Sequence, residues 1–139
     1  MIDIENLVYT NVRNAVKAFN ADIGVSGSYA DVPSSLPPVS IEETDNASVP
    51  TAISTSDREY AANLTYTANI YTNTATAKSD AKAIAEVVND AFTEMGFVRS
   101  MKQEMPNIDR TIYRLILRFQ GTAWKGICGT DGHYNITAR

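Results

Sequence analysis

The residues with the most reactive side chains lie close together near the C-terminus. His133 is the only histidine, Cys128 is the only cysteine, and Asp131 lies between them. Nucleophilic catalysis needs a general base held beside the nucleophile. The surrounding stretch is rich in glycine, whose backbone freedom works against a fixed geometry. We therefore interpret the pairing of Cys128 with His133 as incidental.

Two further groups of residues are candidates for a binding site. Glu42, Glu43 and Asp45 could bind a hard cation, but they lack the spacing of a calcium-binding loop, which favours solvated acids. One cysteine and one histidine are fewer than the usual zinc ligands. Gly24 and Gly27 are followed neither by a Lys-Ser/Thr pair nor by a helical pattern, as a phosphate-binding loop requires. We expect no catalytic residue, no metal, no cofactor and no enzyme activity.

Length and composition favour one cytosolic domain. The chain has 139 residues, and domains cluster at about 100–150 residues. No apolar run approaches the ~20 residues that cross a bilayer. The acidic residues Asp3 and Glu5 stand where a signal peptide has a basic region. We expect synthesis in the cytosol and no membrane contact, and a single cysteine agrees with a reducing compartment.

The net charge of −4 is divided unevenly along the chain. Residues 1–57 hold eight acidic residues against Arg13 and Lys17, for a net charge of −6. Residues 58–139 hold ten basic residues against eight acidic ones, for a net charge of +2. A general nucleic-acid-binding protein would show a basic patch and a high isoelectric point. The split favours two oppositely charged surfaces that meet on different copies of the protein.

Hydrophobic periodicity predicts two helices, over 3–20 with Asp3 as N-cap and over 77–95 with Gly96 as the C-terminal stop. Alternating patterns and turn residues predict strands between and after them. These strands are 39–42, 59–73, 97–105 and 110–124. Residues 43–57 have no period and are expected to form a long mobile loop.

The order α-β-β-α-β-β predicts an α+β fold. We expect a mixed or antiparallel sheet of about four strands with both helices packed on one face. This domain covers 1–125, and 126–139 form a glycine-rich C-terminal extension. A small hairpin between 127–128 and 134–136 could close at Asp131-Gly132.

The predicted strands 59–73 and 110–124 are unusually long. Fifteen residues at ~3.3 Å each reach about 50 Å, whereas a compact chain of this size has a radius of gyration near 14 Å. Such strands must bend or project, unless each contains a bulge or turn and forms two ordinary strands. A projecting strand presents unpaired backbone groups, which cyclic assembly can pair without open-ended growth. We therefore expect the long strands to extend into an oligomeric ring.

Strand 110–124 carries an unusual outward face. Leu115, Leu117 and Phe119 lie on the face that suits the core. The opposite face alternates arginine with isoleucine: Arg110, Ile112, Arg114, Ile116 and Arg118. Coverage by another subunit would explain this pattern, because arginine stems pack and guanidinium groups bind carboxylates. An exposed face with isoleucines tolerated for strand propensity, or contact with DNA, remain alternatives.

Two aromatic residues extend this predicted interface. Strand 59–73 has a face of asparagine and threonine that can form hydrogen bonds across strands, and Tyr71 would add a rigid anchor there. Trp124, at the end of the last long strand, is either a core lid or an interface anchor.

Three stretches resemble the tail terminator (tail completion) proteins of long-tailed bacteriophages. They are residues 68–73 (ANIYTN), the helix 81–95 with the following Gly96-Phe97, and residues 106–114 (PNIDRTIYR). The resemblance covers about residues 3–124. It implies a hexameric ring in the virion that caps the head-proximal end of the tail tube, stops tube polymerisation and provides a docking surface for the head connector. Assembly would take place in the cytoplasm of the bacterial host.

The resemblance also implies that DNA passes through the ring without specific binding. Glu42, Glu43, Asp45 and Asp57 are then candidates for a loop that faces the lumen or a partner, because acids repel phosphates. Two alternatives stay open. One is another neck component, such as a head-completion or head–tail joining protein with a ring of different symmetry. The other is a soluble accessory domain that binds a ligand.

Overall fold

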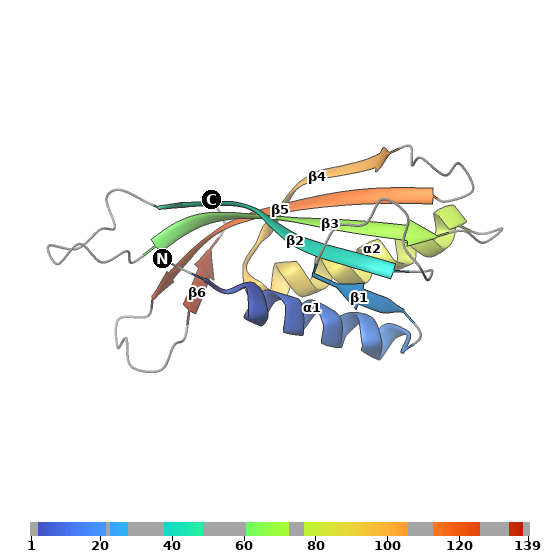
Figure 1. Cartoon of the computed structure of the whole chain (residues 1–139), viewed down its shortest axis with the longest axis horizontal. Coiled ribbons are helices and arrows are strands. Elements are labelled where there is room, and N and C mark those ends of the chain that lie inside the picture. Colours follow the sequence, from blue (N-terminus) through green and yellow to red (C-terminus); the bar gives the residue numbers. More distant parts are fainter. Residues whose placement is uncertain are drawn as a thin grey trace, which may run out of the picture.

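The computed structural model describes residues 3–21, 23–27, 38–48, 61–72, 77–105, 113–125 and 134–137. Two helices and six strands lie in these ranges (Figure 1). In chain order they are α1 (Glu5–Phe19), β1 (Gly24–Ser26), β2 (Pro38–Ser48), β3 (Ala61–Thr72), α2 (Ala77–Met95), β4 (Val98–Met105), β5 (Tyr113–Lys125) and β6 (Tyr134–Thr137).

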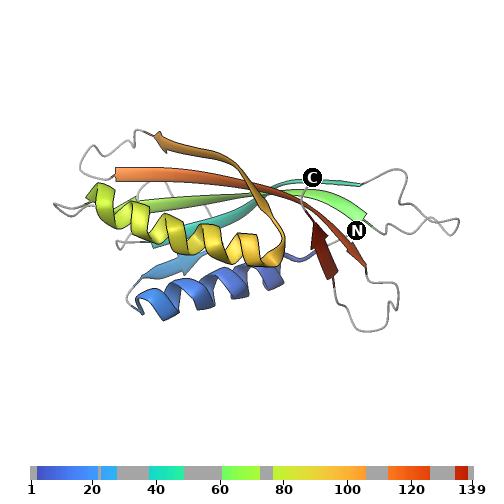
Figure 2. The same ribbon diagram turned by 180° about the vertical axis from the view of Figure 1, so that it is seen from behind.

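The strands form one mixed sheet in the order β1-β2-β3-β5-β4, and β6 pairs with β5 beyond the end of β4. β1 runs parallel to β2, and the other pairs are antiparallel. Both helices pack on the same face, which Figure 2 shows from behind. The predicted α+β class and the predicted helix placement are confirmed, and the sheet gains the short strands β1 and β6.

Each helix is held by one apolar stripe. In α1 the residues Val8, Val12 and Val16 are buried at helical spacing. α2 ends before Gly96, whose φ of 104° is the left-handed conformation that glycine adopts without steric cost.

The prediction that Asp3 is the N-cap of α1 is wrong in detail: Ile4 is the N-cap and makes no side-chain cap bond. Asp3 Oδ1 instead accepts a hydrogen bond from Glu5 N at 3.1 Å, so it still serves one unpaired amide.

An aromatic cluster occupies the space between α2 and the sheet. The Phe92 ring stacks on that of Phe119 at 4.2 Å between centroids, and it meets Phe97 edge-on at 5.5 Å. The Tyr66 ring contacts both Phe92 and Phe97. These rings come from β3, α2, β5 and the turn before β4, so one cluster joins four parts of the chain.

The central pair of strands is long and regular. β3 and β5 align over twelve consecutive residue pairs, from Ala61 with Trp124 to Thr72 with Tyr113, without a register shift. The shifts lie in the neighbouring strands, between Glu43 and Asp45 of β2 and between Arg99 and Met101 of β4. Twelve residues at ~3.3 Å span about 40 Å. The prediction of long strands is therefore correct, and the end of the ribbon beside β6 reaches beyond the helices (Figure 1).

Two sequence predictions are wrong. Glu43 to Ser48 do not begin a loop: they continue β2, because pairing with β3 as far as Ala62 satisfies their backbone. β6 pairs with the end of β5, from Thr122 to Lys125, in place of the partner 127–128 that was predicted for it. Residues 49–57 and 126–133 lie outside the described part of the chain. The predicted boundary between a domain at 1–125 and a C-terminal extension at 126–139 stays a prediction. β6 lies in that extension and pairs with the sheet.

Candidate interaction surfaces

The sheet face opposite the helices, here called the open face, carries most of the predicted interface. Leu115, Leu117 and Phe119 belong to the core cluster, as predicted, so alternate residues of β5 face the other way. The register places Arg114, Ile116 and Arg118 on the open face, each opposite a polar or aromatic residue of β3.

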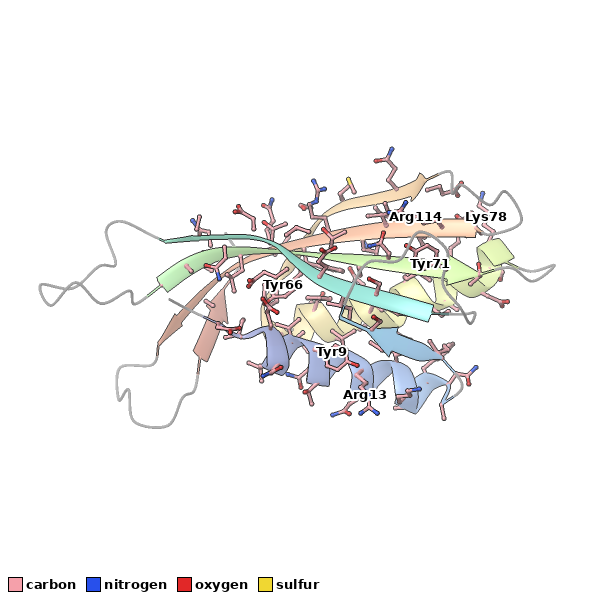
Figure 3. All side chains as sticks on the ribbon, in the orientation of Figure 1. Tyr9, Arg13, Tyr66, Tyr71, Lys78 and Arg114 are labelled. Carbon is pink, nitrogen blue, oxygen red and sulfur yellow. The ribbon has the colours of Figure 1, made fainter. Side chains whose placement is uncertain are left out.

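Arg114 makes its hydrogen bonds inside the chain. Its Nε and Nη2 atoms donate to Asn69 Oδ1 at 3.2 and 3.0 Å. Its guanidinium carbon lies 5.8 Å from the centre of the Tyr71 ring on the neighbouring strand (Figure 3). Asn69 and Tyr71 are both buried. Arg114 therefore ties β5 to β3, and a role of Arg114 or Tyr71 in a subunit interface stays a prediction.

The other predicted interface residues differ in how far they reach solvent. Ile116 is 7% exposed, so the chain itself covers this isoleucine. Arg118 is exposed and has no ion pair among the described residues. Trp124 pairs with Ala61 through the backbone, but its side chain lies outside the description. Arg110 and Ile112 lie outside the described residues, as does Asp57 of the predicted acidic loop. The interface role of all seven residues stays a prediction: Tyr71, Arg110, Ile112, Arg114, Ile116, Arg118 and Trp124.

Polar pairs link the strands across the open face. Thr122 Oγ1 donates to Asn63 Oδ1 at 2.6 Å, and Thr44 Oγ1 lies 3.2 Å from Thr67 Oγ1. This confirms that the asparagine and threonine face of β3 forms hydrogen bonds across strands. These groups bond within the sheet, whereas the charged side chains of Asp45 in β2 and Arg118 in β5 are exposed.

Acidic side chains of β2 point to both faces of the sheet. Glu42 and Asp45 pair with Thr67 and Thr65, so they lie on the open face. Glu43 pairs with Tyr66 and lies on the helix face. Glu42 and Glu43 face opposite sides because side chains alternate along a strand, and the residue inserted between Glu43 and Asp45 returns Asp45 to the open face. We call Glu42, Glu43 and Asp45 the acidic strand.

Exposed bases lie on the other half of the sheet. Arg99 and Lys102 of β4 and Arg118 of β5 are exposed; we call them the basic half. β3 separates β2 from β5 in the sheet order, so the charge split seen along the sequence is also a split across the sheet. Among the described strands, β4 has no outer neighbour, and β2 has none beyond Ser40. In the described part of the sheet, the outer strands on the two sides thus carry opposite charge, and each leaves a stretch without an outer neighbour.

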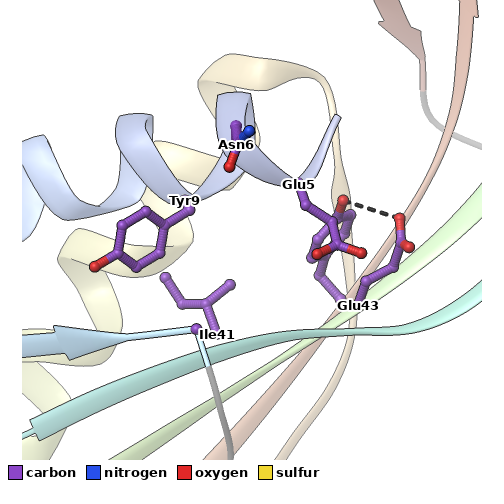
Figure 4. A pocket seen from close by; sticks show the side chains of 7 residues that line it. Glu5, Asn6, Tyr9, Ile41 and Glu43 are labelled. Atoms are coloured by element: carbon purple, nitrogen blue, oxygen red, sulfur yellow. Dashed lines mark hydrogen bonds between the residues drawn. The ribbon is translucent and has the colours of Figure 1, made fainter. Parts of the chain in front are cut away.

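A pocket of about 240 Å³ opens between α1 and β2 (Figure 4). It is lined by Glu5, Asn6, Tyr9, Gly27, Ile41, Glu43 and Tyr66. The Tyr66 hydroxyl donates to Glu43 Oε1 at 3.0 Å. Burial raises the pKa of Glu43 above its usual value, and the nearby Glu5 carboxylate adds to this rise. Burial and the Glu43 charge also raise the pKa of Tyr66.

Sequence reasoning missed this pocket because it assigned Glu43 to a loop. The signal was present, since Val39, Ile41 and Glu43 alternate at the spacing of one strand face. Within the described ranges, no three histidine, cysteine, aspartate or glutamate side chains gather as a metal site. Neither described helix is long and apolar enough to cross a membrane.

Comparison with known proteins supports the fold. No protein-family model and no curated protein sequence matches the chain. A chain in the solved structure "Virion of native gene transfer agent (GTA) particle" aligns with a TM-score of 0.62. The alignment covers 84% of this chain and 91% of that chain at 20% sequence identity. The two chains therefore share a fold.

We expect Arg114→Glu to destabilise the folded chain without changing its secondary structure. The substitution removes two charge-assisted hydrogen bonds to buried Asn69, at a cost of about 1–3 kcal/mol in the free energy of unfolding. Urea denaturation followed by circular dichroism measures this cost. Arg118→Glu, at an exposed site on the same strand face, is the matched control and should change stability by less than about 0.5 kcal/mol. Equal losses in both variants would contradict the role assigned to Arg114.

Proposed function

We propose that this chain is a structural subunit of a phage tail or phage-tail-like particle. It forms a ring, hexameric by the resemblance noted above, at the head-proximal end of the tail tube. The ring stops tube polymerisation and provides the docking surface for the head connector. Support comes from the resemblance of residues 3–124 to tail terminators and from the fold shared with a chain of the gene transfer agent virion.

The observation that supports a ring is that the two sides of the sheet carry opposite charge. The acidic side of β2, which has no outer neighbour beyond Ser40 among the described strands, can meet the basic half of the next copy. Such a head-to-tail contact joins two different surfaces and generates a closed ring when its rotation closes. Opposite charges favour this orientation and oppose contact between like sides. The edges then become covered, which removes the hazard of open strand edges.

Open-face acids that do not take part in the subunit contact would suit passage of DNA through such a ring. Glu42 is half-buried and Asp45 is exposed. Carboxylates that face a lumen would repel phosphates, so DNA slides instead of binding. The partners in this proposal are further copies of the chain, the tail tube protein and the neck proteins, and its location is the virion after assembly in the host cytoplasm.

Tail length in particles made without this protein tests the proposal. We expect tubes longer than those of the intact particle in electron micrographs, because nothing stops polymerisation, together with unattached heads. Supplying the wild-type chain from a plasmid should restore tube length. Tubes of normal length without the protein would contradict termination. Normal tubes with unattached heads would instead support the alternative, another neck component.

A further inference from the structure

The pocket between α1 and β2 combines apolar walls with two carboxylates. The rings of Tyr9 and Tyr66 and the buried side chain of Ile41 supply the apolar surface. Glu5 and Glu43 supply the carboxylates, which lie close together in Figure 4. None of the described residues that line this pocket is a lysine, an arginine or a histidine. Its volume of about 240 Å³ is below the ~300–1,000 Å³ of sites for drug-sized ligands, so it suits a single side chain.

Among the described residues, the charge of these carboxylates is balanced only in part. Glu43 Oε1 accepts hydrogen bonds from the Tyr66 hydroxyl at 3.0 Å and from Asn46 Nδ2 at 3.5 Å. Neither donor carries a positive charge. The first base along α1 is Arg13, eight residues from Glu5, or about 12 Å along the helix. Arg13 is exposed and points away from the sheet (Figure 3). Two adjacent carboxylates in a partly desolvated pocket are stabilised by a cation from elsewhere.

The walls specify what kind of cation fits. Aromatic faces attract a guanidinium or ammonium group, and apolar walls accommodate the methylene stem that carries it. Paired carboxylate oxygens match the donors of an arginine side chain. The pocket also opens beside the part of β2 that has no outer neighbour among the described strands, so another chain can reach it.

We propose that this pocket receives a basic side chain from the basic half of a second copy of this chain, with Arg118 as the first candidate. The inference rests on the proposed ring, since a head-to-tail ring brings the basic half of one copy to the acidic strand of the next. Arg118 is exposed and has no ion pair among the described residues. It lies on β5, which β3 separates from β2 of the same copy. The pocket is thus completed only by assembly.

Binding of a small cation tests the pocket independently of any ring. The full chain is titrated with propylguanidinium, which reproduces the head group and the three-carbon stem of the arginine side chain, and amide shifts are followed by NMR. We expect saturable shifts at Glu5, Glu43 and Tyr66. Glu43→Gln should weaken binding about tenfold, through loss of a charge-assisted contact. Glu42→Gln, a neutral change on the same strand but outside the pocket, should leave binding unchanged. Absence of saturable binding to the wild-type chain would overturn the inference.

Complementation tests whether a second copy supplies the cation. In particles lacking the wild-type gene, Glu5→Lys and Arg118→Glu should each fail to restore tail length, whereas the double variant should restore it in part, because the swapped charges again attract. Glu5 and Arg118 are both exposed, so each variant should fold, which circular dichroism checks. If both single variants restore tail length fully, the inference fails while the ring proposal stands. If tails are normal without any copy of the protein, the proposed function fails. The propylguanidinium titration then still decides whether the pocket binds a cation.

Discussion

Val88→Asp should unfold the domain. Val88 lies on the stripe of α2 that faces the sheet and has no exposed surface. The substitution removes apolar burial and places a carboxylate among core residues that offer it no base. A buried unpaired charge costs several kcal/mol, which is comparable with the total stability of about 5–15 kcal/mol of a typical domain. We expect loss of the cooperative thermal transition in circular dichroism and rapid digestion by a protease.

Ala83→Asp is the matched control for this experiment. It adds the same carboxylate to the same helix at an exposed position. Stability should then fall by less than about 1 kcal/mol, because aspartate has a lower helix propensity than alanine but no burial is lost. A Val88→Asp chain that melts cooperatively near the wild-type temperature would contradict the packing of α2 described above.

Phe92→Ala should produce the second large loss of stability. The Phe92 ring contacts Tyr66, Phe97 and Phe119, so its removal leaves a cavity where three other rings meet. Truncation of a buried phenylalanine costs about 3–5 kcal/mol, through lost apolar transfer and an unfilled cavity. Urea titration should show a lower midpoint with an unchanged slope, since the surface exposed on unfolding stays nearly the same.

Phe19→Ala is the control for Phe92→Ala. Phe19 is the last residue of α1 and its side chain is 52% exposed. The same chemical truncation there removes little buried surface and should cost less than about 1 kcal/mol. Similar losses in the two variants would show that the aromatic cluster is not the centre of the core.

The two faces of the β3–β5 ribbon hold its register in different ways. On the helix face, apolar residues such as Leu64 and Leu117 must point into the core, and a slip by one residue would expose them. On the open face, polar pairs such as Asn63 with Thr122 and Asn69 with Arg114 form only in this register. The long ribbon thus has a unique alignment that is set within the chain itself.

Local pattern in the sequence was sufficient for most of the fold. The helical spacing of Val8, Val12 and Val16 predicted α1, and Gly96 marked the end of α2. Strict alternation predicted β3 and β5 and identified Leu115, Leu117 and Phe119 as core residues. These features were predictable because burial of one face of a helix or strand imposes its period on neighbouring residues in the chain. The uneven charge was likewise visible from residue types alone.

Only the tertiary structure decided the candidate surfaces. β2 continues to Ser48 because β3 pairs with it, although its own sequence carries little hydrophobic signal there. Alternation along β2 turns Glu43 toward the pocket, and the extra residue between Glu43 and Asp45 places Asp45 on the open face. Arg114 bonds to Asn69, forty-five residues away. Each of these outcomes depends on contacts between distant segments, so residue types and local periods predicted which groups carry charge, and pairing between strands decided where those charges lie.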